Sequence, residues 1–142
     1  MKQYFSHSVT ETQQIARDLA AQLRSGDVIA FTGGLGMGKT AFTHGLAEGL
    51  GIQAEVTSPT FALVNEYRGR ERTLYHFDMY RVESFDDLYS TGFFDYLDQG
   101  GILAIEWSEN IAGALPEDAI TVAFEQIDET TRKITIEGGG RF

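Results

Sequence analysis

The sequence has no cysteine and no long apolar segment among its 142 residues. The absence of cysteine excludes disulfide bonds and thiolate metal sites, and nothing in the composition points to an oxidising compartment. No apolar run approaches the roughly 20 residues that span a bilayer, and residues 1–14 are too polar for a secretory signal. We therefore expect a soluble, cytoplasmic protein that makes no contact with a membrane.

Positive charge is also scarce. The chain has 21 acidic and 11 basic residues, which gives a formal net charge of −10, and only three of the basic residues are lysines. Proteins that neutralise the phosphates of a nucleic acid usually show a cationic face, because the release of counterions drives that binding. This chain has little with which to build such a face, so direct binding to a nucleic acid is not expected.

The length and the 42% share of apolar side chains allow one buried core. We therefore predict a single domain over residues 1–142, with residues 137–142 as a frayed tail. Periodicity and capping residues predict helices over 11–23, 40–50 and 84–89, and apolar or alternating runs predict strands over 27–32, 61–69, 73–80, 101–107, 119–126 and 132–138. Strands that alternate with helices indicate a three-layer α/β domain with a mixed central sheet.

The sequence FTGGLGMGKT, residues 31–40, follows a predicted strand and precedes a predicted helix. From Gly33 to Thr40 it fits the pattern G-x-x-x-x-G-K-[ST] of the phosphate-binding P-loop. Glycines let the backbone N–H groups wrap around phosphate oxygens, and the helix N-terminus favours a bound anion. Lys39 would reach the β- and γ-phosphates of ATP, and Thr40 would place its hydroxyl on Mg²⁺. The predicted fold is a P-loop NTPase domain, whose expected nucleotide-binding residues are Gly34, Leu35, Gly36, Met37, Gly38, Lys39, Thr40 and Ala41.

A nucleoside triphosphatase also needs an acidic side chain at a strand end, to hold the Mg²⁺ shell or to orient the attacking water. Asp78 ends the sequence LYHFD and Glu106 ends ILAIE. Glu106 follows the more apolar strand and is the first choice, although either residue could be an ordinary strand-end carboxylate. Trp107 would point away from Glu106 in an alternating strand, which leaves core packing and contact with a ligand or partner equally open. His76 lies within a strand and is predicted to be a core residue.

The sequence TSPTF, residues 57–61, lies between the P-loop helix and the following hairpin. Pro59 stiffens this segment, while Ser58 and Thr60 offer hydroxyl groups toward a γ-phosphate or its attacking water. The segment is therefore a candidate nucleotide-sensing switch. An ordinary turn would have a similar composition.

Four sequences in this order, GGLGMGKT, SPTF, HFDMYR and IEW, resemble the TsaE (YjeE) family of small bacterial ATPases. The resemblance covers most of the chain and implies an ATPase needed to form threonylcarbamoyladenosine at position 37 of tRNA. It implies action with the TsaD and TsaB proteins, of which TsaD transfers the group onto tRNA. Contact with tRNA would then be indirect, and ATP hydrolysis would be slow until these partners stimulate it.

The resemblance also assigns roles to individual residues. It implies that Lys39 binds phosphate, that Thr40 and Glu106 bind Mg²⁺, and that Asp78 lies near the catalytic centre. It makes Trp107 and the segment of Ser58, Pro59 and Thr60 candidates for partner or switch contacts. Adenine contacts in the family come from the N-terminal segment and the C-terminal hairpin, where the matching residues are Thr10, Glu11 and Arg132. Gly34 stands where the family usually has aspartate, a change that can alter affinity without removing binding.

Two other functions remain open. A small-molecule kinase would also have a P-loop, but it usually carries an arginine-bearing lid, for which Arg68, Arg70 and Arg72 are the nearest candidates. A GTPase or nucleotide-gated binding module is the other class. The guanine-reading sequence N-K-x-D is absent, which disfavours GTP.

Overall fold

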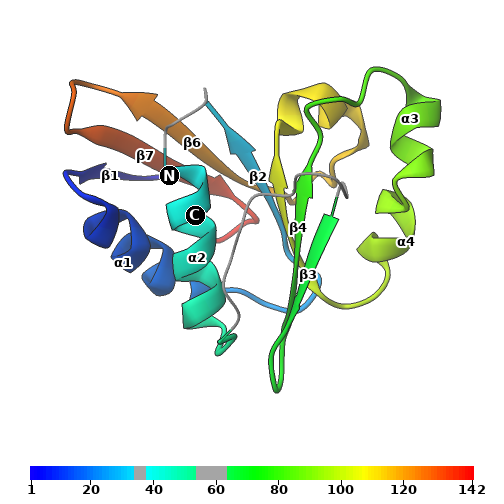
Figure 1. Cartoon of the computed structure of the whole chain (residues 1–142), viewed down its shortest axis with the longest axis horizontal. Coiled ribbons are helices and arrows are strands. Elements are labelled where there is room, and N and C mark those ends of the chain that lie inside the picture. The colour runs from blue at the N-terminus through cyan, green and yellow to red at the C-terminus, as the bar shows by residue number, and fades with distance from the viewer. Residues whose placement is uncertain (34–37, 54–63) are drawn as a thin grey trace.

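The computed structural model describes residues 1–33, 38–53 and 64–142. These residues form a seven-stranded mixed sheet with helices on both faces, which confirms the predicted fold class (Figure 1). The strands are β1 (Lys2–Ser6), β2 (Val28–Thr32), β3 (Val64–Arg68), β4 (Thr73–Asp78), β5 (Ile102–Glu106), β6 (Ile120–Gln126) and β7 (Arg132–Gly138). The helices are α1 (Val9–Ala20), α2 (Lys39–Gly49), α3 (Phe85–Ser90), α4 (Phe93–Leu97) and the 3-10 helix η1 (Ser108–Ala114).

The strand order across the sheet is β1-β7-β6-β2-β5-β4-β3. Strand β5 is parallel to both of its neighbours, β2 and β4, and β2 is also parallel to β6. The predicted hairpins β3–β4 and β6–β7 are antiparallel, as is the pairing of β1 with β7. Because neighbouring parallel strands end at the same edge of a sheet, the carboxyl ends of β2, β5 and β4 lie side by side.

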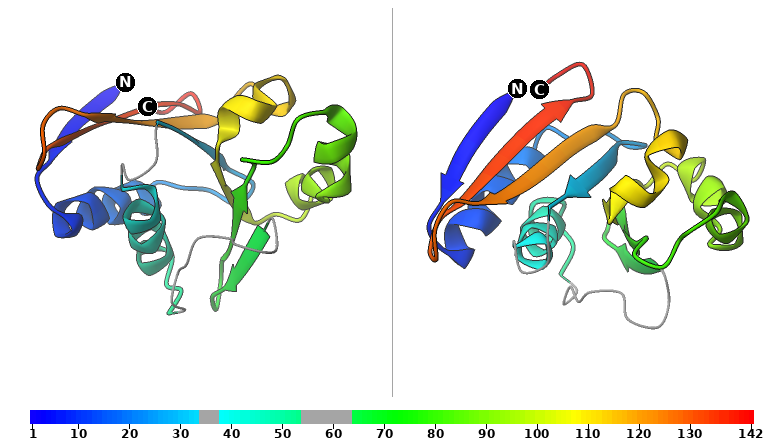
Figure 2. Two further views of the ribbon diagram at one scale, coloured as in Figure 1. Left: turned by 45° about the horizontal axis from the view of Figure 1, so that its top comes forward. Right: turned by 90° about the horizontal axis from the view of Figure 1, so that it is seen from above.

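The side chains of the central strands alternate between two hydrophobic clusters, one on each face of the sheet. In β5, Ile102 and Ala104 pack in the cluster that contains α1 and α2, whereas Leu103 and Ile105 pack in the cluster that contains α3 and α4. Figure 2 shows the two helix pairs on opposite sides of β4 and β5. Such burial on both faces explains why β5 reads as a continuous apolar run.

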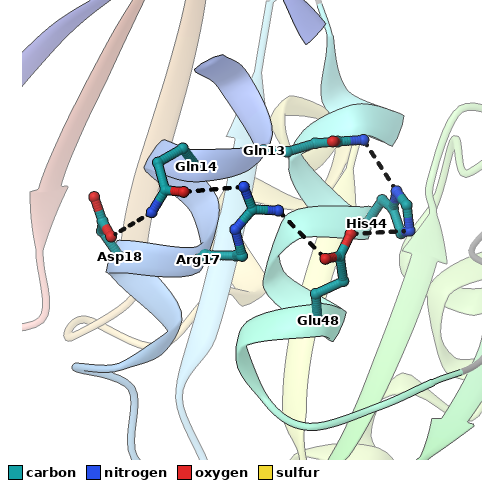
Figure 3. A network of polar contacts seen from close by, with 6 residues as sticks. All are labelled: Gln13, Gln14, Arg17, Asp18, His44 and Glu48. Carbon is teal, nitrogen blue, oxygen red and sulfur yellow. Dashed lines mark hydrogen bonds and ion pairs between the residues drawn. The ribbon is translucent and has the colours of Figure 1, made fainter. Parts of the chain in front are cut away.

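Helix α2, which follows the glycine loop, is held against α1 by close backbone packing. A Cβ atom at Gly45 would clash with the backbone of Gln13, so glycine permits this approach. Around the contact, Arg17 pairs with Glu48 at 3.3 Å and His44 pairs with Glu48 at 3.2 Å (Figure 3). Exposed ion pairs contribute only about 0–1 kcal/mol each. Packing therefore supplies most of the free energy that orients α2.

Three short elements, β1, α4 and η1, are not indicated by the sequence. Strand β1 is an edge strand with mostly exposed side chains, so it lacks an apolar alternation. Helix α4 has five residues and η1 has seven, too few to show a helical period. Within the described part of the chain, no helix has the length and apolar character needed to cross a bilayer.

Residues 137–142, predicted to fray, are instead held against the domain. Strand β7 continues to Gly138, and the guanidinium of Arg141 pairs with the carboxylate of Asp27 at 2.7 Å. The same guanidinium donates a hydrogen bond to the carbonyl of Gln22 at 2.7 Å, and Phe142 packs against the core. These partners lie more than one hundred positions away along the chain. Local composition cannot reveal such contacts.

Candidate functional site

The two described glycines between β2 and α2 have backbone conformations that suit a phosphate-binding loop. Gly33 follows the strand with φ = 121°, and Gly38 precedes the helix with φ = 96°, both in the region that favours glycine. The predicted strand and helix are therefore present on either side of residues 34–37. Part of the predicted nucleotide-binding set lies outside the described residues, namely Gly34, Leu35, Gly36 and Met37.

Gly33 is also constrained by contact with a neighbouring strand. A Cβ atom at this position would lie 2.6 Å from the backbone oxygen of Phe124 in β6. We expect Gly33→Ala to lower the free energy of unfolding by about 2–4 kcal/mol, because it adds a steric clash to an unfavourable φ. Urea unfolding measures this change. Gly26→Ala is the matched control, since Gly26 has φ = 89° but open space around it. Equal losses in the two variants would show that the contact with Phe124 is unimportant.

Lys39, the first residue of α2, has a buried side chain with unusual surroundings. The residue is only 5% exposed, and its ammonium group donates a hydrogen bond to the carbonyl of Gly33 at 2.6 Å. The ammonium also lies 5.2 Å from the centre of the Trp107 ring. No carboxylate of the described residues lies within 4.0 Å of it. A buried cation is costly unless it is paired, and an ammonium has three N–H donors. Lys39 therefore has donors and charge available for an anion.

The two acidic candidates lie side by side at the carboxyl edge of the sheet. Asp78 and Glu106 are the last residues of β4 and β5, and the strand register pairs them directly. Asp78 accepts a hydrogen bond from the backbone of Tyr80 at 2.9 Å. Glu106 accepts one from the His76 ring, with 2.6 Å between Oε2 and Nε2. Strand β5 also neighbours β2, so both carboxylates belong to the same edge as the glycine loop. Their catalytic roles remain predictions.

Trp107 lies beyond the end of β5, where strand alternation no longer applies. Its φ of 58° is the only positive value found for a residue other than glycine in the described chain. This turn places the indole ring beside the ammonium group of Lys39. The ring of Tyr80, in the segment that follows β4, lies 5.0 Å from the Trp107 ring between centroids. Trp107 is partly buried and packs against the cluster that contains α3 and α4, so core packing is observed, and contact with a ligand or partner stays a prediction.

A cavity of about 170 Å³ lies beside the beginning of α2. The residues around it come from the N-terminal segment, α2 and the β6–β7 turn, and they are Ser6, Ser8, Val9, Thr12, Gly38, Ala41, Glu129, Thr130 and Arg132. Gly38, Ala41 and Arg132 are predicted site residues. The predicted Thr10 and Glu11 are not among the lining residues, although their neighbours Val9 and Thr12 are.

The helix cap at Ser8 explains why Val9 and Thr12 line the cavity in place of Thr10 and Glu11. The hydroxyl of Ser8 accepts a hydrogen bond from the backbone of Glu11 at 3.1 Å, so α1 begins at Val9, two residues before its predicted beginning. The Glu11 carboxylate accepts a hydrogen bond from the backbone of His7 at 3.1 Å and so helps to close the cap. A serine three residues before a glutamate is the sequence signal that could have identified this wall of the cavity.

The other wall of the cavity is the turn between β6 and β7. The carboxylate of Asp128 accepts hydrogen bonds from the backbone of Thr130 at 2.9 Å and of Thr131 at 2.8 Å. Hydrogen bonds from Thr130 and Thr131 hold the pKa of Asp128 below its ordinary value. Thr131 also contacts the ring of His7 at 3.1 Å, which ties the turn to the N-terminal segment. The turn thereby presents Thr130 and Arg132 in a defined position.

The remaining predicted residues fall into two groups. Thr40 is exposed in the first turn of α2, at the end of the helix that faces the carboxyl edge. Ser58, Pro59 and Thr60, the candidate switch, lie outside the described residues. Over residues 1–33, 38–53 and 64–142, no cluster of three or more histidine, aspartate or glutamate side chains could hold a metal ion.

A larger cavity of about 550 Å³ lies on the opposite face, between α3, α4 and η1. Its walls are largely apolar and include Phe85, Leu88 and Ile111. None of the predicted site residues lines it, so size alone does not identify the site. The buried lysine and the adjacent carboxylates place the candidate chemistry at the carboxyl edge instead.

Comparison with known proteins finds similar sequences over most of the chain. The sequence model of one family, described as threonylcarbamoyl adenosine biosynthesis protein TsaE, matches residues 6–134. The chain is 40% identical over 131 residues to the tRNA threonylcarbamoyladenosine biosynthesis protein TsaE of Treponema pallidum, covering 92% of this chain and 96% of that protein. It is 39% identical over 138 residues to the protein of the same name from Aquifex aeolicus, covering 96% of each.

A solved structure extends the similarity to the fold. The crystal structure of YdiB from Bacillus subtilis superposes with a TM-score of 0.79 and 32% sequence identity, covering 98% of this chain and 86% of that one. The similarity therefore extends over nearly the whole length of the chain.

Proposed function

The chain belongs to the TsaE family of threonylcarbamoyl adenosine biosynthesis proteins, and we propose that it binds and hydrolyses ATP with Mg²⁺ in support of this modification of tRNA. The observation that carries the proposal is Lys39, a buried ammonium that follows a glycine loop and meets only a carbonyl oxygen and an aromatic ring among the described residues. Phosphate oxygens would accept the remaining hydrogen bonds of this ammonium group and neutralise its charge.

The residues at the carboxyl edge fit the parts of a nucleoside triphosphate. The first backbone N–H groups of α2 have no helical partner and favour an anion, so they would bind phosphate together with Lys39. The cavity lined by Val9, Ala41 and Arg132 lies beside Gly38 at the beginning of this helix. A nucleotide whose phosphates meet Lys39 would place its base there.

The same edge offers a site for Mg²⁺. This ion is usually held by one or two protein oxygens together with phosphate oxygens and water. The Thr40 hydroxyl and the Glu106 carboxylate would supply the protein oxygens. The bound ion would neutralise charge that develops on the phosphates during hydrolysis.

The carboxylates provide the remaining chemistry. Attack on the γ-phosphate requires a water molecule in line with the bond that breaks. Glu106 would orient this water or hold the metal shell. The carboxylate of Asp78, which lies beside Glu106 in the strand register, would act near the same catalytic centre. Lys39 would stabilise the charge that grows on the phosphate oxygens as the bond to the leaving group lengthens.

A small-molecule kinase is the first alternative, and the structure disfavours the lid that the sequence suggested for it. Arg68, Arg70 and Arg72 lie at the turn between β3 and β4, where β4 begins. The length of β4, about 16 Å at 3.3 Å per residue, separates this turn from Asp78. Arg72 is also engaged, since it donates a hydrogen bond to the carbonyl of Leu23 at 2.8 Å. A nucleotide-gated binding module remains the second alternative.

The acidic charge of the chain suggests how it would act on tRNA. With a net charge of −10, the isolated protein has little cationic surface for a phosphate backbone. We propose that TsaD and TsaB are its partners, that contact with tRNA is made through them, and that they raise a slow ATP hydrolysis.

The test uses the purified chain with and without a TsaD–TsaB complex. We expect Mg²⁺-dependent ATP binding in a titration calorimeter, weaker binding of GTP, no tRNA retention on a filter at physiological salt, and faster ATP turnover when the complex is added. Equal affinity for GTP would contradict the adenine preference. Transfer of phosphate from ATP to metabolites, with turnover indifferent to the complex, would favour the kinase.

A further inference from the structure

His76 is fully buried in β4, yet it contacts the candidate catalytic edge. The residue is 0% exposed, and its Nε2 lies 2.6 Å from Oε2 of Glu106. The flanking residues of the strand, Tyr75 and Phe77, point to the other face and pack in the cluster with α3 and α4. His76 therefore faces the side of the sheet on which α2 and its Lys39 lie.

The other ring nitrogen shows that His76 is not well suited to a purely structural position. Its Nδ1 is buried and makes no hydrogen bond to any described residue. A buried polar atom without a partner lowers stability, and an apolar side chain of similar size would avoid this loss. The contact with Glu106 is thus the feature of His76 that an apolar residue could not replace.

This contact fixes one oxygen of Glu106 and leaves the other available. An ionised carboxylate only accepts hydrogen bonds, so Nε2 of His76 must be the donor. Glu106 retains 13% exposure of its side chain at the open edge, and its Oε1 has no partner in the described portion of the chain. A glutamate has several rotatable bonds, and free rotation would spread its carboxylate over many positions.

The strand register explains how the contact orients the carboxylate. His76 lies beside Ala104 and Asp78 lies beside Glu106, so the histidine is one pleat behind the two carboxylates on the same face. From there its ring reaches forward to Glu106, while full burial keeps it from substrate or water. Catalytic groups act faster when hydrogen bonds fix their geometry before the reaction.

We propose that His76 is a positioning residue for ATP hydrolysis, which holds Oε2 of Glu106 so that Oε1 faces the attacking water or the metal shell. The inference rests on the proposed ATPase function. It assigns His76 no contact with the nucleotide and no proton transfer, so its effect should appear in turnover and not in binding.

The kinetic test compares His76→Leu with His76→Gln. Leucine removes the donor and fills the core, whereas the glutamine amide can donate from a position close to that of Nε2. We expect His76→Leu to lower kcat roughly tenfold, with KM and the ATP dissociation constant changed less than threefold. His76→Gln should restore most of kcat. A structural role would instead lower thermal stability in proportion to activity, and glutamine would rescue nothing.

A spectroscopic test does not depend on activity. The chain has three histidines, so ring signals in a ¹H–¹⁵N spectrum can be assigned with single substitutions. We expect the Nε2–H of His76 to exchange slowly with water in the nucleotide-free protein and to change its chemical shift in Glu106→Gln. His44, which is half-buried on α2 and away from Glu106, is the internal control, and its signal should not move.

The outcomes separate the two proposals. Unchanged kcat in His76→Leu, failure of His76→Gln to rescue a defect, or a rapidly exchanging Nε2–H would each overturn the positioning role while leaving the ATPase intact. If the wild-type chain hydrolyses no ATP with its partners, the proposed function fails and the positioning role fails with it, even where the spectrum confirms the hydrogen bond.

Discussion

Lys39→Ala is expected to weaken ATP binding by roughly 100-fold or more and to remove measurable hydrolysis. Hydrogen bonds to charged groups contribute about 1.5–3 kcal/mol each, and an ammonium in this position would reach oxygens of two phosphates. A loss of about 3 kcal/mol corresponds to a factor of more than 100 in the dissociation constant. Titration calorimetry with Mg²⁺ and ATP measures the change directly.

We also expect Lys39→Ala to be as stable as the wild-type protein. In the absence of nucleotide, the wild-type ammonium is buried with one hydrogen bond to Gly33, so its removal should not lower the free energy of unfolding. Lys133→Ala is the matched control, because it removes the same charge from β7, away from the glycine loop. Retention of ATP affinity in Lys39→Ala, or equal losses in the two variants, would contradict the assigned phosphate contact.

Glu106→Gln is expected to lower ATP turnover by roughly 10²-fold or more while nucleotide affinity changes only a few fold. The substitution keeps the size of the side chain and an oxygen that can face His76, but it removes the negative charge. If Glu106 acts on the attacking water or the metal shell, its effect belongs mainly to the transition state, and turnover falls more than binding. Single-turnover hydrolysis together with calorimetry separates the two quantities.

Two control variants make this result specific. Glu109→Gln removes the same charge from an exposed position three residues away and should leave turnover unchanged. Asp78→Asn tests the adjacent carboxylate in the paired register position. Full activity in Glu106→Gln combined with a large loss in Asp78→Asn would transfer the principal role to Asp78.

Much of the candidate site could be predicted because its signals are local. A phosphate-binding loop needs glycines, a lysine and a helix within a few residues, and the positive φ values at Gly33 and Gly38 agree with this reading. The apolar run of β5 likewise indicates a strand buried on both faces, which led to Glu106 at its end. The start of α3 is also a local signal, since the hydroxyl of Ser84 accepts a hydrogen bond from the backbone of Asp87 at 3.1 Å and caps the helix.

The features that could not be predicted depend on partners far apart in the chain. Arg141 holds the C-terminal residues because Asp27 faces it across the fold. The cavity beside Gly38 combines the N-terminal segment with the β6–β7 turn, and the pairing of β1 with β7 brings these together. His76 reads as an ordinary core residue until the register of β4 and β5 shows which carboxylate it meets.

The amino-acid sequence by itself determined the glycine loop, Lys39 and the order of all strands and helices except β1, α4 and η1, because backbone freedom, charge and apolar periodicity are properties of short segments. The tertiary structure alone decided that Asp78 and Glu106 lie side by side, that the Trp107 ring covers Lys39, and that His76 holds Glu106. The physical reason is strand register and loop conformation. Pairing parallel strands selects which residues become neighbours, and that choice depends on the packing of the whole sheet.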